Sequence, residues 1–136
     1  QLPRKVEKGA LRGALAAKPG GRLLLVPDAM PPVGADDPSY ELYGEIITAV
    51  DGVVRNAAGS LAGSALDMAT AVRNTVQLLG QPLAEAARMA STYPARFLNV
   101  DDRLGHIADG FQADLVLLDD ALQVRGTWIA GQYEAA

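Results

Sequence analysis

The run "LLLV" at residues 23–26 constrains the fold of this chain more than any other feature. Its four consecutive apolar residues lack the polar alternation of a strand with one face in water. They predict a strand that is apolar on both faces, and such strands lie inside parallel sheets covered by helices. The sequence therefore predicts an α/β fold with this run as an interior strand.

Asp28 follows the predicted strand at its carboxyl end. Ligands bind where the carboxyl ends of parallel strands meet, and an acid held there against an apolar wall can act as general base and general acid. Asp is also common in turns, and Asp28 stands just before Pro31-Pro32, so it can instead cap a turn. Its position alone leaves both interpretations open.

The segments on either side of this run are predicted as a helix and a loop. Residues 6–18 place Leu11 and Leu15 four apart, with alanines on the same side, which predicts an amphipathic helix ending at Pro19-Gly20-Gly21. Residues 31–38 are rich in Pro, Gly and Asp and predict a loop. We therefore expect a helix, the buried strand and a loop in that order.

The middle of the chain predicts a hairpin followed by a capped helix. Residues 46–50 and 53–55 flank Asp51-Gly52, a preferred pair for a tight hairpin turn. A Gly/Ser stretch, residues 56–64, leads into a helix in which Ser64 is the expected N-cap and Asp67 returns the hydrogen bond. Gly80 ends this helix. Its expected buried stripe consists of Ala69, Val72, Val76 and Leu79.

The rest of the chain predicts a second helix and then a β unit. Pro82 opens a helix to about residue 91, which Tyr93-Pro94 breaks. A turn at residues 105–110 precedes two strands, residues 113–118 and 124–129. Ala130-Gly131 then turns the chain into Gln132-Tyr133.

Composition excludes several classes of function. The net charge is −4 and Lys and Arg form no cluster, so nucleic acid is not an expected partner. No apolar run approaches the ~20 residues that cross a bilayer, so no membrane association is expected. Cysteine is absent, which excludes disulfides and thiolate metal sites and favours a cytoplasmic protein.

The segment "GSLAGSALDM", residues 59–68, is a second candidate site. Its glycines let backbone N–H groups approach a ligand, and the following helix N-terminus favours an anion. It matches no nucleotide-binding motif, so a flexible lead into a capped helix is the preferred explanation.

Other chemistry-bearing residues predict structural roles. His106 is the only histidine and lies in a glycine-bounded turn, whereas a catalytic metal normally takes about three protein ligands. Trp128 and Ile129 are predicted to pack in the last hairpin. Asp101-Asp102 and Asp119-Asp120 are adjacent pairs whose side chains point to opposite faces of an extended chain.

Several segments together resemble one family. "LLLVPDAMPPVG", "GSLAGSALDMATAVRNTVQLLG", "EAARMASTYPARFLNVDDRLGHIADGFQADLVLLD" and "TWIAGQ" are similar, in family order, to the C-terminal part of the N-acetylglucosamine-6-phosphate deacetylases of the amidohydrolase superfamily. The closing "GHIADGFQADLVLLD" indicates an amidohydrolase. The Asp-Ala-Met-Pro and Ser-Leu-Ala-Gly-Ser segments narrow the resemblance to the sugar deacetylase.

The resemblance implies a partial (β/α)₈ barrel, TIM-type, followed by strands of a small β-sandwich. Residues 1–98 would belong to the barrel, with residues 23–26 as its eighth strand, and residues 99–136 to the sandwich. Asp28 would take a proton from the attacking water and pass it to the departing amine. Leu61, Ala62 and Gly63 would contact the amino sugar.

The resemblance also implies a divalent metal, zinc by expectation, whose ligands and the phosphate-binding residues lie outside this chain. The isolated chain is then expected to be inactive, with an amino-sugar phosphate as substrate of the intact enzyme. Two alternatives stay open: a segment of another amidohydrolase, such as a cyclic-amide hydrolase, or a non-catalytic, self-associating fragment. Open strand edges favour self-association, so we expect a homo-oligomer.

Overall fold

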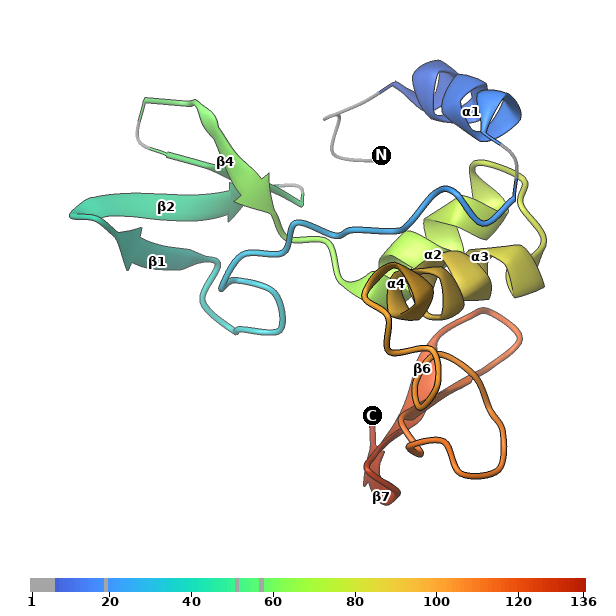
Figure 1. The fold of residues 1–136 in the computed structure, drawn as a ribbon. Coiled ribbons are helices and arrows are strands. Elements are labelled where there is room, and N and C mark those ends of the chain that lie inside the picture. Colours follow the sequence, from blue (N-terminus) through green and yellow to red (C-terminus); the bar gives the residue numbers. More distant parts are fainter. Residues whose placement is uncertain (1–6, 19, 51, 57) are drawn as a thin grey trace.

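The computed structural model describes residues 7–18, 20–50, 52–56 and 58–136. Figure 1 shows an antiparallel sheet on one side, a layer of helices in the middle and a second small sheet beyond them. The elements in chain order are α1 (Lys8–Ala17), β1 (Ser39–Leu42), β2 (Glu45–Val50), β3 (Val53–Arg55), β4 (Leu61–Ser64), α2 (Met68–Gln77), α3 (Leu83–Ala90), α4 (Thr92–Phe97), β5 (Leu115–Leu118), β6 (Val124–Ile129) and β7 (Gln132–Ala135).

The first sheet is an antiparallel meander in the order β1-β2-β3-β4. Its central hairpin confirms the prediction from the Asp-Gly pair: β2 pairs with β3, and Val50 faces Val53 across the turn. Asp51 itself lies outside the described residues. One face of this sheet is its core, where Ile47 is 4% and Val54 0% exposed. The flanking strands β1 and β4 were not predicted.

The helical layer contains α2, α3 and α4, and α1 lies beside it across the extended segment that follows Gly20 (Figure 1). Helix α1 confirms the predicted first helix over its described residues. Of the predicted stripe on α2 only Val72 is buried, together with Ala71 and Thr75 on the same helix. No helix within the described residues has the length and hydropathy needed to span a bilayer.

The second sheet pairs β5 with β6 and β6 with β7, all antiparallel, which confirms the predicted terminal β unit. Helix α2 contacts the turn between β5 and β6 of this sheet. The Arg73 guanidinium donates to the Leu122 carbonyl oxygen at 2.9 and 3.2 Å and to Gln123 Oε1 at 3.1 Å. The sheet is therefore tied to the helices through side-chain donors as well as through the chain.

The prediction of a buried strand at residues 23–26 is wrong for this structure. The segment is extended but forms no strand, and Val26 is 74% exposed. Its Leu25 N–H donates to the Met89 carbonyl oxygen at 3.0 Å, which fixes it to α3. The reason is physical: within the described parts of the chain no parallel strand lies beside it, so no ladder forms.

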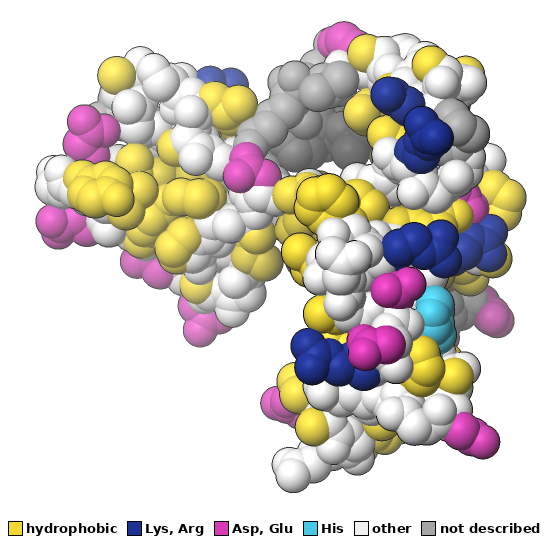
Figure 2. Space-filling model, in the orientation of Figure 1, with side chains coloured by type: hydrophobic (Ala, Val, Ile, Leu, Met, Phe, Trp, Pro, Cys, Tyr) yellow, Lys and Arg dark blue, Asp and Glu magenta, His cyan; other side chains and the backbone are white. Residues whose placement is uncertain are grey.

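The chain exposes more surface than a compact monomer of its size. Its accessible surface is 9023 Å², whereas about 6,800 Å² is expected for a compact monomer of 14.2 kDa. Figure 2 shows apolar side chains gathered on the face of the β1–β4 sheet and between it and the helices. Large exposed apolar residues include Val26, Tyr43, Ile46, Val50 and Leu61.

The start of α2 differs from the prediction. Asp67 is the N-cap: its Oδ1 accepts from the Thr70 N–H at 2.8 Å and its Oδ2 from the Thr70 hydroxyl at 2.6 Å. Ser64, the predicted cap, lies in β4. Partial burial raises the pKa of the Asp67 carboxyl, but the hydrogen bonds from Thr70 and the charge of Arg73 outweigh burial, so its pKa lies below the usual value.

Replacing this cap should cost stability in a pH-dependent way. Asp67→Ala is expected to lower the free energy of unfolding by about 1 kcal/mol at pH 7, because the Thr70 amide loses its acceptor. A depressed folded-state pKa contributes stability above the unfolded-state pKa, and this contribution disappears as pH falls through the folded-state value. Urea unfolding at neutral and acidic pH measures it. If the free energies of unfolding of wild type and variant differ by the same amount at neutral and acidic pH, Asp67 is not the charged N-cap described here.

The turn at residues 105–110 lies close against α4. Thr92 Oγ1 donates to the Gly105 carbonyl oxygen at 2.7 Å. Gly105 has a φ of +89°, and an added Cβ would lie 2.7 Å from Ala95 Cβ and 3.2 Å from the Ser91 carbonyl oxygen. Gly110 has a similar φ of +83°, but an added Cβ there meets no atom within 4 Å.

These two glycines form a matched pair for a stability test. Both alanine variants carry the cost of a left-handed backbone, and only Gly105→Ala adds a collision with α4. We expect Gly105→Ala to lower the free energy of unfolding by roughly 1–3 kcal/mol more than Gly110→Ala. Denaturant unfolding of the two variants measures this difference. Equal losses would show that the turn does not pack on α4 as described.

Candidate functional site

The two motifs that carry the family resemblance are bonded to each other. The Ser64 N–H donates to the Asp28 carbonyl oxygen at 3.0 Å, and the Met30 N–H donates to the Ser64 carbonyl oxygen at 2.9 Å. These bonds form a parallel bridge between Ala29 and Ser64. Residues 28–30 therefore run alongside the end of β4, which places Asp28 beside the Ser-Leu-Ala-Gly-Ser segment.

Asp28 has an unusual backbone. Its φ of +55° lies in the left-handed region, where a residue other than glycine costs roughly 1 kcal/mol and Asp is one of the better tolerated types. The residue is exposed. The bridge to Ser64 fixes its carbonyl group while leaving the residue at the surface, so Asp28 combines a constrained backbone with access to solvent.

The predicted substrate-binding residues lie on β4. Leu61 is 50% exposed and Ala62 is exposed, whereas Gly63 is buried. The Gly/Ser stretch was predicted to be a flexible lead into a helix, and that is wrong for its last four residues, which form this strand. Leu61, Ala62 and Gly63 thus lie on the strand that Asp28 is bonded to, and Gly63 lies next to the junction.

Sequence reasoning missed Met30. An added Cβ on Gly63 would lie 2.2 Å from Met30 Cγ and 2.9 Å from its Sδ, so the Met30 side chain covers Gly63 directly. A glycine inside a strand marks a close approach, and this is the signal that could have found the contact.

The anion-binding interpretation of residues 59–68 loses support. Thr70 N–H at the start of α2 is occupied by the Asp67 carboxylate, which also brings negative charge to this helix end. The Ser64 hydroxyl oxygen is used locally as well, because it accepts from the Leu66 N–H at 2.9 Å. This helix start is arranged for capping.

The remaining polar candidates lie in structural contacts. The His106 ring packs against Phe111 in a tilted arrangement with ring centroids 5.1 Å apart, and the Trp128 ring packs in the same way against Tyr133 at 4.9 Å. The Gln123 backbone N–H and the Arg125 guanidinium hold the pKa of Asp119 below its usual value. Within the described ranges, no three His, Cys, Asp or Glu side chains come together as a metal site would require.

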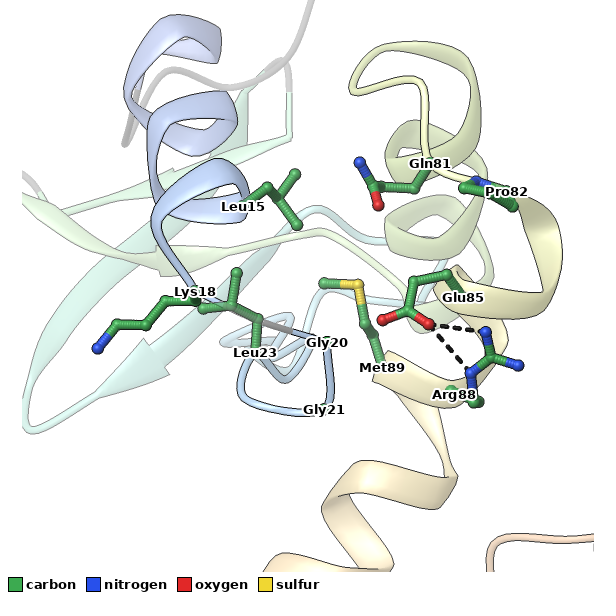
Figure 3. Close-up of a pocket in the computed structure, with 10 residues that line it drawn as sticks. All are labelled: Leu15, Lys18, Gly20, Gly21, Leu23, Gln81, Pro82, Glu85, Arg88 and Met89. Carbon is green, nitrogen blue, oxygen red and sulfur yellow. Dashed lines mark hydrogen bonds and ion pairs between the residues drawn. The ribbon is translucent and has the colours of Figure 1, made fainter.

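A pocket of about 340 Å³ lies between α1, the segment after it and α3 (Figure 3). Leu15 and Leu23 line one side, and Glu85 faces them from α3. The Glu85 carboxylate already accepts from Arg88 at 2.8 and 3.0 Å and from the Tyr93 hydroxyl at 3.0 Å. No predicted site residue lines this pocket, so the Asp28–Ser64 junction is the candidate functional site.

Comparison with known proteins defines the class. The model of the Amidohydrolase family matches residues 36–133, so this chain belongs to that family. This confirms the resemblance drawn from the motifs.

Particular relatives are sugar-phosphate deacetylases. The chain is 49% identical over 111 residues to N-acetylgalactosamine-6-phosphate deacetylase of Escherichia coli O157:H7, covering 82% of this chain and 29% of that protein. It is 41% identical over 125 residues to N-acetylglucosamine-6-phosphate deacetylase of Bos taurus, covering 90% of this chain and 30% of that protein. The crystal structure of N-acetylglucosamine-6-phosphate deacetylase from Pasteurella multocida matches with a TM-score of 0.90 at 35% identity. The match covers 98% of this chain and 35% of that one. The chain thus spans 29–35% of the length of these three proteins.

Proposed function

We propose that this chain supplies the general base and acid of an enzyme that removes the acetyl group from N-acetylglucosamine 6-phosphate. One observation carries the proposal: the bridge between Asp28 and Ser64 joins the two motifs of the resemblance at a single junction. The names of the relatives favour a sugar deacetylase over a cyclic-amide hydrolase.

Asp28 is proposed to handle the proton of the reaction. Its carboxylate takes a proton from the water that attacks the acetamide carbonyl carbon. The carbon–nitrogen bond then breaks, and Asp28 returns the proton to the departing nitrogen, giving acetate and glucosamine 6-phosphate. Such a role contributes roughly 10²- to 10⁴-fold in rate. Asp28 is an exposed residue, which supports access of water and substrate to this position.

The strand beside Asp28 is proposed to bind the amino sugar. Leu61 offers an exposed apolar side chain, Ala62 a small one, and Gly63 brings the backbone of β4 next to Asp28. A sugar whose acetamide group reaches the Asp28 carboxylate would then lie along this strand.

The described residues do not form a site for the divalent metal that the resemblance implies. Amidohydrolases are generally metal-dependent, but the described part of this chain brings no three ligating side chains together. We therefore propose that the divalent metal, zinc by resemblance, is held by residues outside this chain, and that the chain alone does not hydrolyse the substrate.

The wider setting follows from the resemblance. We propose a cytoplasmic, homo-oligomeric enzyme in which residues 1–98 belong to a (β/α)₈ barrel and residues 99–136 to a small β-sandwich. The accessible surface of 9023 Å² supports further packing partners for this chain.

The role of Asp28 can be tested in a chimera in which this chain replaces the matching third of the Pasteurella multocida enzyme. Once the unmodified chimera is active, Asp28→Asn should lower kcat by at least ~10²-fold, because the amide cannot take the proton. Metal content should stay the same. Turnover close to that of the unmodified chimera would remove Asp28 from the mechanism. The isolated chain with added Zn²⁺ is the negative control.

A second candidate substrate is N-acetylgalactosamine 6-phosphate, which is the sugar named for the 49% identical relative. The two sugars differ only in the orientation of the hydroxyl at C4. If this chain serves a glucosamine enzyme, the chimera should keep the ratio of kcat/KM values for the two sugars that the unmodified Pasteurella enzyme has. A shift of ~10-fold or more toward the galactosamine sugar would instead favour the second candidate.

A further inference from the structure

Gly63 has no conformational reason to be glycine. It lies inside β4 and is not among the residues with positive φ. Glycine weakens a strand interior, since it loses more freedom on folding than other residues. We therefore attribute the glycine at position 63 to a steric requirement. The Met30 side chain occupies the position of a Cβ, because an added Cβ would lie 2.2 Å from Met30 Cγ.

Met30 holds β4 at two successive residues. Its side chain covers Gly63, and its backbone N–H donates to the Ser64 carbonyl oxygen at 2.9 Å. Gly63 pairs with Val54, which is 0% exposed, so the Met30 side chain enters the buried face of the sheet. A one-residue slip of residues 28–30 along β4 would take this side chain out of that face.

Asp28 also lies next to Gly63 and Ser64. Its carbonyl oxygen accepts from the Ser64 N–H at 3.0 Å and lies 3.6 Å from the position of the added Gly63 Cβ. The left-handed backbone of Asp28 is unfavourable by itself and needs surrounding contacts to hold it. The Ser64 N–H bond is one contact that holds it, and Met30 packs on the neighbouring residue of β4.

We propose that Met30 and Gly63 form a positioning contact that sets the register of residues 28–30 against β4 and thereby the location of the Asp28 carboxylate. This inference rests on the proposed function and gives Gly63 a role different from direct contact with the sugar. A methyl group at position 63 displaces Met30, stretches the Ser64 bridge and moves the carboxylate. A misplacement of about 1 Å can cost 10²-fold in rate.

The first experiment uses the chain by itself and needs no activity. Hydrogen exchange of the Ser64 and Met30 amides is measured in wild type, Gly63→Ala, Met30→Ala and the double variant. Gly63→Ala should speed exchange of both amides at least ~10-fold, and adding Met30→Ala should restore only part of the protection, since the collision is then gone but the side chain that sets the register is gone as well. Gly20→Ala is the control, because Gly20 also lacks a positive φ, lies outside any helix, and an added Cβ there comes no closer than 3.9 Å to another atom. Unchanged exchange in Gly63→Ala would overturn the proposal.

The second experiment separates positioning from sugar contact in the active chimera. Gly63→Ala should lower kcat at least ~10-fold with little change in KM, and Met30→Ala in the same chain should recover part of the loss by removing the collision. A raised KM that Met30→Ala does not rescue would mean that the methyl group meets the sugar directly, and the positioning role would be wrong. Failure of the proposed function is distinct, because Asp28→Asn would then retain turnover.

Discussion

Everything at the candidate site depends on the pair of backbone hydrogen bonds that Ser64 makes with Asp28 and Met30. They join the extended segment after α1 to the β1–β4 sheet, while the Leu25 bond to Met89 joins the same segment to the helices. Residues 23–30 therefore bridge the helical layer and the first sheet, as Figure 1 shows. Asp28 lies where this bridge reaches the sheet, and the bridge fixes an exposed acid in a backbone conformation that it would otherwise avoid.

The buried strand at residues 23–26 was predicted from an apolar pattern that depends on the surroundings of a segment as much as on its conformation. Four apolar residues in a row fit a strand with neighbours on both edges and helices on both faces. In the described residues the segment runs between α1 and the helical layer (Figure 1), but it has no neighbouring strand at residues 23–26, and Val26 is exposed. The large accessible surface of the chain has the same origin, since apolar side chains suited to burial lie at the surface.

Much of the secondary structure follows from local chemistry. The Asp-Gly turn identified the β2–β3 hairpin, the leucine spacing identified α1, and the terminal strands followed from their β-branched and apolar content. The pattern did not reveal β4, because Leu-Ala-Gly-Ser has low strand propensity and becomes a strand only through its pairing with β3. Ser64 was a plausible N-cap by type, but its backbone is engaged by residues 28–30, and Asp67 caps the helix instead. For the site, position alone indicated Asp28, whereas Met30 gave no signal of its own and became visible only through the space left by Gly63.

The central claim is that Asp28 and Met30 are held by Ser64, and scalar couplings across hydrogen bonds measure this directly in the isotopically labelled chain. The account predicts a resolved coupling between the Ser64 amide nitrogen and the Asp28 carbonyl carbon, and another between the Met30 amide nitrogen and the Ser64 carbonyl carbon. The backbone pairs of β2 and β3 serve as the internal reference. Couplings present in that hairpin but absent at both Ser64 positions would contradict the account.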